Sequence, residues 1–158
     1  MRRWPTWAAL AVVTVVGLAC NGEGDSPGGG DEPQARKVCD TRVVAAPYAV
    51  IVHRSVVMRT ETRSSCDVPP TAHVVHITVE YRAERSSAWT PAYRAEPCRE
   101  LPRPGNSVNC QANGYGICKP GDWRTRVLVT GSGPDGRAFA FDVPEMPERT
   151  IRECPRVG

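Results

Sequence analysis

Apolar and polar residues alternate with a period of two along three stretches of the chain. Residues 122–130 (DWRTRVLVT) and 137–143 (RAFAFDV) follow the same pattern as residues 73–83 (HVVHITVEYRA). Successive side chains of a β-strand point to opposite faces, so the pattern predicts three half-buried strands. The inward faces are predicted to carry Val75, Ile77, Val79 and Tyr81 in the first strand, Trp123, Thr125, Val127 and Val129 in the second, and Phe139, Phe141 and Val143 in the third.

Other stretches predict further short strands. Residues 48–63 (YAVIVHRSVVMRTETR) fit one long strand or two, with a bulge near residues 53–55, where the alternation blurs. Weaker candidates are residues 42–45, 89–93 and 150–154, and no stretch has the periodicity and caps of a helix. About seven short strands predict an all-β fold, a single antiparallel β-sandwich of immunoglobulin-like type stapled by disulfides. A small β-barrel is the alternative.

The N-terminal region has the composition of an export signal. Two arginines follow Met1, and residues 7–18 are almost entirely apolar. Twelve residues are too few for a membrane span, which needs about twenty, so we expect a secretory signal peptide over residues 1–19. Residues 21–36 are rich in glycine, proline and acids, which is typical of a flexible tether. The predicted organisation is therefore a signal peptide (1–19), Cys20 with its tether (20–36) and one folded domain (37–158).

Cys20 is the first residue after the predicted cleavage point. The stretch VGLAC (residues 16–20) resembles the lipobox of bacterial lipoproteins. The resemblance implies that the Cys20 thiol receives a diacylglyceryl group and that its amine usually receives a further acyl chain. Several acyl chains anchor a protein stably, so the resemblance implies attachment to the cell membrane or outer membrane, with the domain outside the cytoplasm. Plain secretion, with Cys20 removed or unused, is the alternative.

Six further cysteines lie in the predicted domain, and an even number in an exported chain predicts three disulfides. A zinc site is the rival interpretation, but at least seven residues separate any two cysteines, whereas zinc ligands come in closely spaced pairs. The spacing favours Cys110–Cys118 as a local bridge, with Cys39–Cys154 and Cys66–Cys98 as the other two. Cys98–Cys118 is the main competitor. The six residues are Cys39, Cys66, Cys98, Cys110, Cys118 and Cys154.

Charge and motifs exclude several function classes. The chain has 20 basic and 17 acidic residues, and residues 37–158 keep an excess of four positive charges, which predicts no nucleic-acid partner. Residues 131–136 match G-x-G-x-x-G, but a strand follows them rather than a helix, so we expect a hairpin turn and no nucleotide or other cofactor. His73 and His76 fall on opposite faces of one strand, which predicts no metal site. No arrangement typical of a catalytic site is visible, and we expect a protein that is not an enzyme.

Aromatic residues and one cysteine-rich segment are the remaining candidates for binding. Trp89 and Tyr93 surround Pro91, which is typical of an edge strand or loop. Residues 98–118 carry Arg99, Arg103 and Tyr115 between three cysteines, and a loop so restrained loses little entropy on binding. The function predicted is a non-catalytic binding or structural module of the cell envelope, with a protein or cell-wall polymer as partner. The alternative is an exported enzyme inhibitor, or an enzyme whose site is assembled from distant residues.

Overall fold

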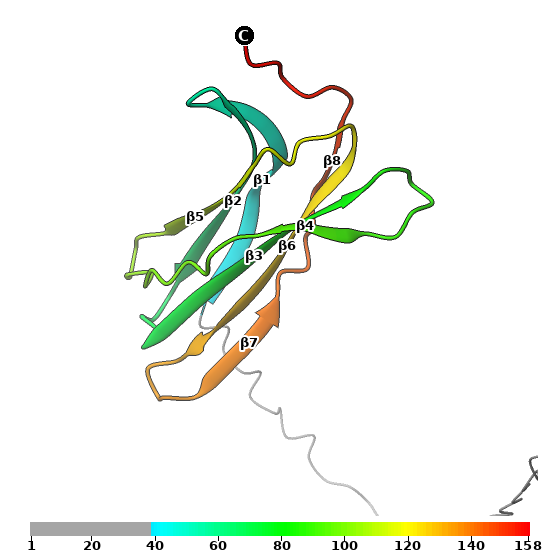
Figure 1. The fold of residues 1–158 in the computed structure, drawn as a ribbon. Coiled ribbons are helices and arrows are strands. Elements are labelled where there is room, and N and C mark those ends of the chain that lie inside the picture. Colours follow the sequence, from blue (N-terminus) through cyan, green and yellow to red (C-terminus); the bar gives the residue numbers. More distant parts are fainter. Residues whose placement is uncertain (1–38) are drawn as a thin grey trace, which may run out of the picture. The chain divides into compact units, whose positions relative to one another are not determined.

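The alternating stretches form strands in two antiparallel sheets that face each other (Figure 1). The structure is a computed structural model that describes residues 39–158. Sheet A has the order β1 (Cys39–Val52), β2 (Ser55–Cys66) and β5 (Val108–Tyr115). Sheet B has the order β4 (Thr90–Arg94), β3 (Ala72–Arg82), β6 (Gly121–Ser132) and β7 (Ala138–Asp142), and β8 (Glu148–Ile151) also pairs with β6.

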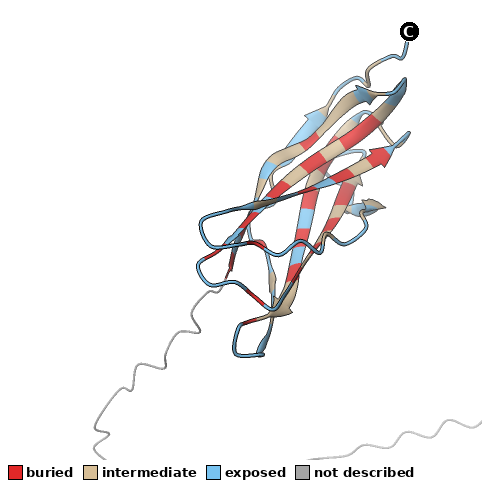
Figure 2. Ribbon diagram, turned by 90° about the vertical axis from the view of Figure 1, so that its left-hand side faces the viewer, coloured by how far each residue is buried: buried red, intermediate tan, exposed pale blue. Residues whose placement is uncertain are grey.

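The all-β expectation is confirmed, and the described residues contain no helix. No helix in this part of the chain therefore has the length and apolar character that a membrane crossing needs. The two sheets are separate and do not close into a ring, so the barrel alternative is wrong and the sandwich is confirmed. Buried and exposed positions alternate along the strands (Figure 2).

The inward faces of sheet B agree with the sequence pattern. Val75, Val79, Val127 and Val129 are buried in the core together with Trp123, whose ring lies 4.8 Å from that of Tyr81. The Trp123 indole N–H donates to the Lys119 carbonyl oxygen at 3.0 Å, which satisfies the one polar atom of this buried side chain.

The stretch at 48–63 is divided between two strands rather than forming one bulged strand. Val52 pairs with Ser55, and the two residues between them, His53 and Arg54, have φ values of 46° and 62°. Positive φ at both central positions is the geometry of a tight two-residue hairpin turn. The register shifts of β1 fall elsewhere, between Val43 and Tyr48, so the predicted bulge position is wrong.

The last two strands share one edge of β6. β7 pairs with the second half of β6 and β8 with its first half, so the two lie one after the other along that edge. The strand predicted at 150–154 is β8, which begins two residues earlier and ends three residues earlier. The motif at 131–136 is the hairpin between β6 and β7, as expected: Gly133 N–H donates to the Arg137 carbonyl at 2.8 Å, and Gly136 has a φ of 77°.

All six cysteines of the domain form disulfides, as expected, but none of the expected pairs is correct. The bridges are Cys39–Cys66, Cys98–Cys110 and Cys118–Cys154. Cys110 and Cys118 cannot meet because the chain between them runs extended along β5 as far as Tyr115, about 17 Å at the rise of a β-strand, whereas a bridge needs Cα atoms within about 7 Å. Three disulfides point to an oxidising compartment outside the cytoplasm.

Candidate binding face

The outward side chains of sheet A form an ordered polar surface. The registers of β2 and β5 set Arg59 opposite Asn113, Glu61 opposite Gln111, and Arg63 opposite Asn109. On the other side of β2, β1 sets Tyr48 opposite Arg59 and Arg42 opposite Arg63. We call this set the sheet A face: Arg42, Tyr48, Arg59, Glu61, Arg63, Asn109, Gln111 and Asn113.

Cross-strand hydrogen bonds hold most of these side chains in place. Arg59 Nε donates to Asn113 Oδ1 at 2.8 Å, and Arg63 Nε donates to Asn109 Oδ1 at 3.1 Å. Directly opposite residues on one face of a sheet are close enough to bond in this way. Each arginine therefore places its Nε donor on a neutral amide, and Arg59 has a further side-chain hydrogen bond with Tyr48.

Glu61 is the carboxylate at the centre of the sheet A face. It accepts a hydrogen bond from the Tyr48 hydroxyl at 2.9 Å and another from Gln111 Nε2 at 3.3 Å. Burial raises the pKa of Tyr48, and the hydrogen bond and negative charge of Glu61 raise it further. Tyr48 is therefore a neutral donor at physiological pH, and it fixes the position of the Glu61 carboxylate.

The arginines of the sheet A face, Arg42, Arg59 and Arg63, have no ion-pair partner in the part of the chain that the structure describes. Arg42 and Arg63 stand directly opposite each other, and like charges in this position repel. Both line a hollow of about 500 Å³ that also includes Ser65, Asp67 and Asn106. The arrangement favours an anionic group placed between the two guanidinium groups.

The outer face of sheet B gathers charges in a different way. Arg124 Nε lies 2.6 Å from Glu80 Oε2, and Arg82 lies 3.2 Å from Asp122 and 3.1 Å from Glu148. These acids neutralise the two arginines, so the network holds β3, β6 and β8 together without an external partner.

Asp122 has a second partner within that network. The Thr150 hydroxyl donates to Asp122 Oδ1 at 2.6 Å. This bond, followed by the contact with Arg82, lowers the pKa of Asp122.

The structure does not bring the predicted binding residues together. Trp89 lies on the outer face of sheet B, where the guanidinium carbons of Arg82 and Arg124 lie over its ring at 4.3 and 4.4 Å from the ring centre. Tyr93 pairs with Val79 and packs partly buried against the core. Both side chains are therefore partly buried, and Tyr93 lies in the edge strand β4, as its proline neighbour indicated. Their binding role stays a prediction.

Residues 98–118 are not one loop, which corrects the predicted working surface. Residues 108–115 form β5, and only the parts before and after it connect strands. Arg99 and Arg103 are exposed in the first part, and Tyr115 is 61% exposed at the end of β5. Their role in binding stays a prediction, and Cys20 lies outside the described residues.

Sequence reasoning missed the sheet A face, although a signal for it was present. Polar side chains recur at every second position as Arg59, Glu61 and Arg63 in one stretch and as Asn109, Gln111 and Asn113 in another. A period of two among polar residues indicates the outward side of a strand. The register that sets the two stretches side by side could not be read from either one alone.

Comparisons with known proteins add little. No protein-family model matches the chain, and no curated protein is similar to it in sequence. A solved structure titled the putative ApaA protein from Bordetella pertussis is 13% identical, with a TM-score of 0.41, over 72% of this chain and 94% of that one. Beta-glucosidase from Kluyveromyces marxianus (TM-score 0.32) and beta-glucosidase 3B from Thermotoga neapolitana (TM-score 0.34) are each 13% identical over 71% of this chain, which spans only 15% and 17% of theirs.

Proposed function

We propose that this chain is an exported, non-catalytic module that binds an anionic polymer of the cell envelope through the sheet A face. The observation that carries the proposal is that three arginines, Arg42, Arg59 and Arg63, form no ion pair among the described residues, while Arg59 and Arg63 hydrogen-bond to amides. Guanidinium groups bind carboxylate and phosphate with two parallel hydrogen bonds. Regularly spaced arginines therefore suit a chain of regularly spaced anionic groups.

The shape of the face supports an extended partner. The residues lie in rows across three strands, and their hydrogen bonds fix them before a ligand arrives. A surface already held in its bound geometry loses little entropy on binding. The amides of Asn109, Gln111 and Asn113 add donors and acceptors for the hydroxyl groups of a polysaccharide.

We also propose that the β-sandwich is of immunoglobulin-like type. The order β1-β2-β5 opposite β3-β6-β7 agrees with an immunoglobulin-like sandwich in which β4 has joined the edge of β3. Such sandwiches serve many functions, so the fold does not identify the partner.

Binding to defined polymers tests the proposal. The exported chain is expected to be retarded in affinity electrophoresis by alginate, a carboxylated polysaccharide, and not by neutral dextran. The double variant Arg42→Gln/Arg63→Gln should lose the retardation, and raising the salt concentration should weaken it in the wild type. The matched control is Arg126→Gln/Arg137→Gln, which removes one exposed arginine of β6 and one of the turn before β7. Equal loss in both variants, or equal binding of dextran, would contradict the proposal.

We further propose that acyl chains at Cys20 anchor the module at the membrane. VGLAC and the tether that follows support this proposal. The mass of the mature chain from a bacterial host tests it: the wild type should begin at Cys20 and carry the acyl mass, and Cys20→Ser should not. A wild-type N-terminus at Asn21, without acyl mass, would exclude the anchor.

A further inference from the structure

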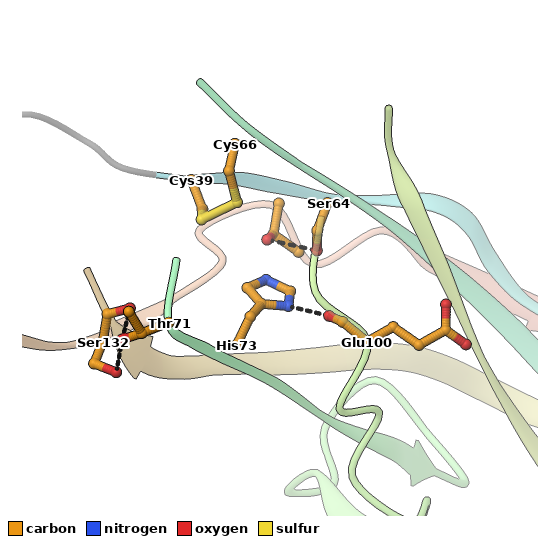
Figure 3. The surroundings of a disulfide bond; sticks show 8 residues. Cys39, Ser64, Cys66, Thr71, His73, Glu100 and Ser132 are labelled. Atoms are coloured by element: carbon orange, nitrogen blue, oxygen red, sulfur yellow. Dashed lines mark hydrogen bonds between the residues drawn. A yellow bond between two sulfur atoms is a disulfide. The ribbon is translucent and has the colours of Figure 1, made fainter. Parts of the chain in front are cut away.

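One buried polar atom among the described residues has no hydrogen-bond partner. It is Nε2 of His73, on an imidazole that is 1% exposed at the start of β3. The other ring nitrogen, Nδ1, lies 3.1 Å from the carbonyl oxygen of Glu100 (Figure 3). A carbonyl oxygen can only accept, so Nδ1 carries the proton and donates it. In the neutral ring, Nε2 is then left with a free lone pair in the protein interior.

The lone pair of His73 faces the disulfide between Cys39 and Cys66. The two sulfurs and a ring nitrogen of His73 all lie within 4.8 Å of one another, and Figure 3 shows the unbonded nitrogen turned toward the bridge. Cys39 and Cys66 are 2% and 5% exposed. No other set of three such side chains gathers in residues 39–158, and the other two bridges have no histidine of this kind.

Two sulfurs and an imidazole are the ligands of thiophilic cations such as zinc. A histidine that ligates a metal usually donates its second ring N–H to a carbonyl or carboxylate, which orients the ring. His73 already has this contact through Glu100. In the disulfide form the sulfurs are bonded to each other and offer no thiolate. We propose that reduction of Cys39–Cys66 opens a buried site for a thiophilic divalent cation, ligated by Cys39, Cys66 and His73.

The fold holds the two thiols together after the bridge is cut. Cys39 and Cys66 are directly paired residues of β1 and β2, with Cα atoms 4.1 Å apart. The next rows of the same hairpin are intact, and the hydroxyls of Thr41 and Ser64 bond at 2.9 Å. A zinc-like cation binds sulfur at about 2.3 Å and nitrogen at about 2.0 Å, so the three ligand atoms would have to move by on the order of 1 Å. A water molecule would supply the fourth ligand of a tetrahedral site.

The chemistry is a reduction followed by ligation. A dithiol reductant supplies two electrons and two protons, the bond between the sulfurs of Cys39 and Cys66 breaks, and the dithiol becomes a disulfide. Cation binding then releases the two thiol protons to solvent and forms two metal–sulfur bonds and one metal–nitrogen bond.

Cadmium titration tests the proposal, because cadmium–thiolate bonds absorb in the ultraviolet. The full chain is reduced with a dithiol, freed of reductant without oxygen, and titrated with Cd²⁺. We expect one tight site per chain, with X-ray absorption showing two sulfurs and one nitrogen. The oxidised chain should not bind. His73→Gln should weaken Cd²⁺ binding by more than about tenfold. Even the loss of a residue that only hydrogen-bonds to a metal ligand typically lowers metal affinity by at least that factor.

Matched cysteine variants separate this site from non-specific thiol binding. Cys118→Ser/Cys154→Ser keeps the proposed ligands and should bind Cd²⁺ as the wild type does, whereas Cys39→Ser/Cys66→Ser should not. Near-ultraviolet circular dichroism of the buried Trp123 reports whether each reduced variant is folded. The proposal is overturned if His73→Gln binds as tightly as the wild type, if Cys39→Ser/Cys66→Ser retains the site, or if the reduced wild type unfolds and Cd²⁺ does not restore its signal.

Discussion

Sheets A and B both present arginines on their outer faces, but the partners of these arginines differ. In sheet B, Arg82 and Arg124 contact carboxylates, and both guanidinium groups lie over the ring of Trp89. In sheet A, Arg59 and Arg63 contact the neutral amides of β5. The same residue type therefore completes an ionic network in one sheet and, among the described residues, forms no ion pair on the face of the other.

This difference separates a structural role from a binding role. An arginine paired with its own carboxylate has little to gain from an external anion, because binding would break the existing pair. An arginine on an amide keeps its charge available and is already oriented. We therefore expect substitutions in sheet B to change mainly stability, and substitutions on the sheet A face to change mainly binding.

The largest effect on stability is expected from Trp123→Ala in the core face of sheet B. The side chain is fully buried, and its loss leaves a cavity, so unfolding should need about 3–5 kcal/mol less free energy. Tyr115→Ala in sheet A is the control, since an exposed side chain should change stability by less than about 0.5 kcal/mol. Urea denaturation of both variants measures the two losses of unfolding free energy. Equal losses in Trp123→Ala and Tyr115→Ala would contradict the prediction.

Replacing one glutamate by glutamine in each sheet should lower the free energy of unfolding by less than Trp123→Ala does, and by different amounts in the two sheets. Glu80→Gln removes the charged partner of Arg124 at a largely buried position and should cost about 1.5–3 kcal/mol. Glu61→Gln keeps an acceptor for Tyr48 on a more open surface and should cost less than about 1 kcal/mol. If denaturation shows the larger loss for Glu61→Gln, the assignment of roles to the two sheets is wrong.

Acid should destabilise the domain through sheet B. The pKa of Asp122 is lowered by the Thr150 hydroxyl and by Arg82. The contribution of Asp122 to the stability of the fold is therefore fully present above the ordinary aspartate pKa near 4. It is lost as the pH falls through the lowered pKa of the folded state, because the unfolded chain binds the proton more readily. Melting temperatures from pH 6 to pH 2 should fall less steeply for Asp122→Asn, with Thr150→Val intermediate. An unchanged slope in both variants would exclude this contribution.

The double variant of the two paired arginines on the sheet A face is expected to have the smallest effect on stability and the greatest effect on binding. Arg42→Gln/Arg63→Gln removes two like charges that stand opposite each other, so the melting temperature should stay the same or rise slightly. A gain or loss below about 0.5 kcal/mol is the range expected for surface substitutions. A large loss in thermal denaturation would mean that these arginines support the fold.

The inner faces explain why the sequence predicted one sheet better than the other. Sheet B sets Val75, Ile77 and Val79 against polar outward neighbours, so its strands stand out in the pattern. Sheet A buries Val57 and Met58 at one end of β2, but its other inward positions include the polar or small residues Thr60, Thr62, Ser64, Cys110 and Ala112. Polar or small residues on both faces give no alternation, and β5 therefore went unrecognised.

Thr60 carries a buried hydroxyl of sheet A that finds a partner in the other sheet. Thr60 Oγ1 bonds to Thr125 Oγ1 of sheet B at 2.7 Å and to the Ala45 carbonyl at 2.7 Å. A sequence cannot reveal such a partner, which is 65 residues away. The disulfide pairs were missed for the same reason: the number of bridges follows from composition and export, but their connectivity depends on which strands become neighbours.

The most direct test of the account is to observe which face a short anionic oligosaccharide contacts. Chemical shifts of the isotope-labelled chain are recorded by nuclear magnetic resonance during titration with an alginate oligosaccharide. We expect the side-chain amides of Asn109, Gln111 and Asn113 and the guanidinium groups of Arg42 and Arg63 to shift, while Arg82, Arg124 and Trp89 do not. Shifts confined to the sheet B network, or no shifts at saturating oligosaccharide, would contradict binding through the sheet A face.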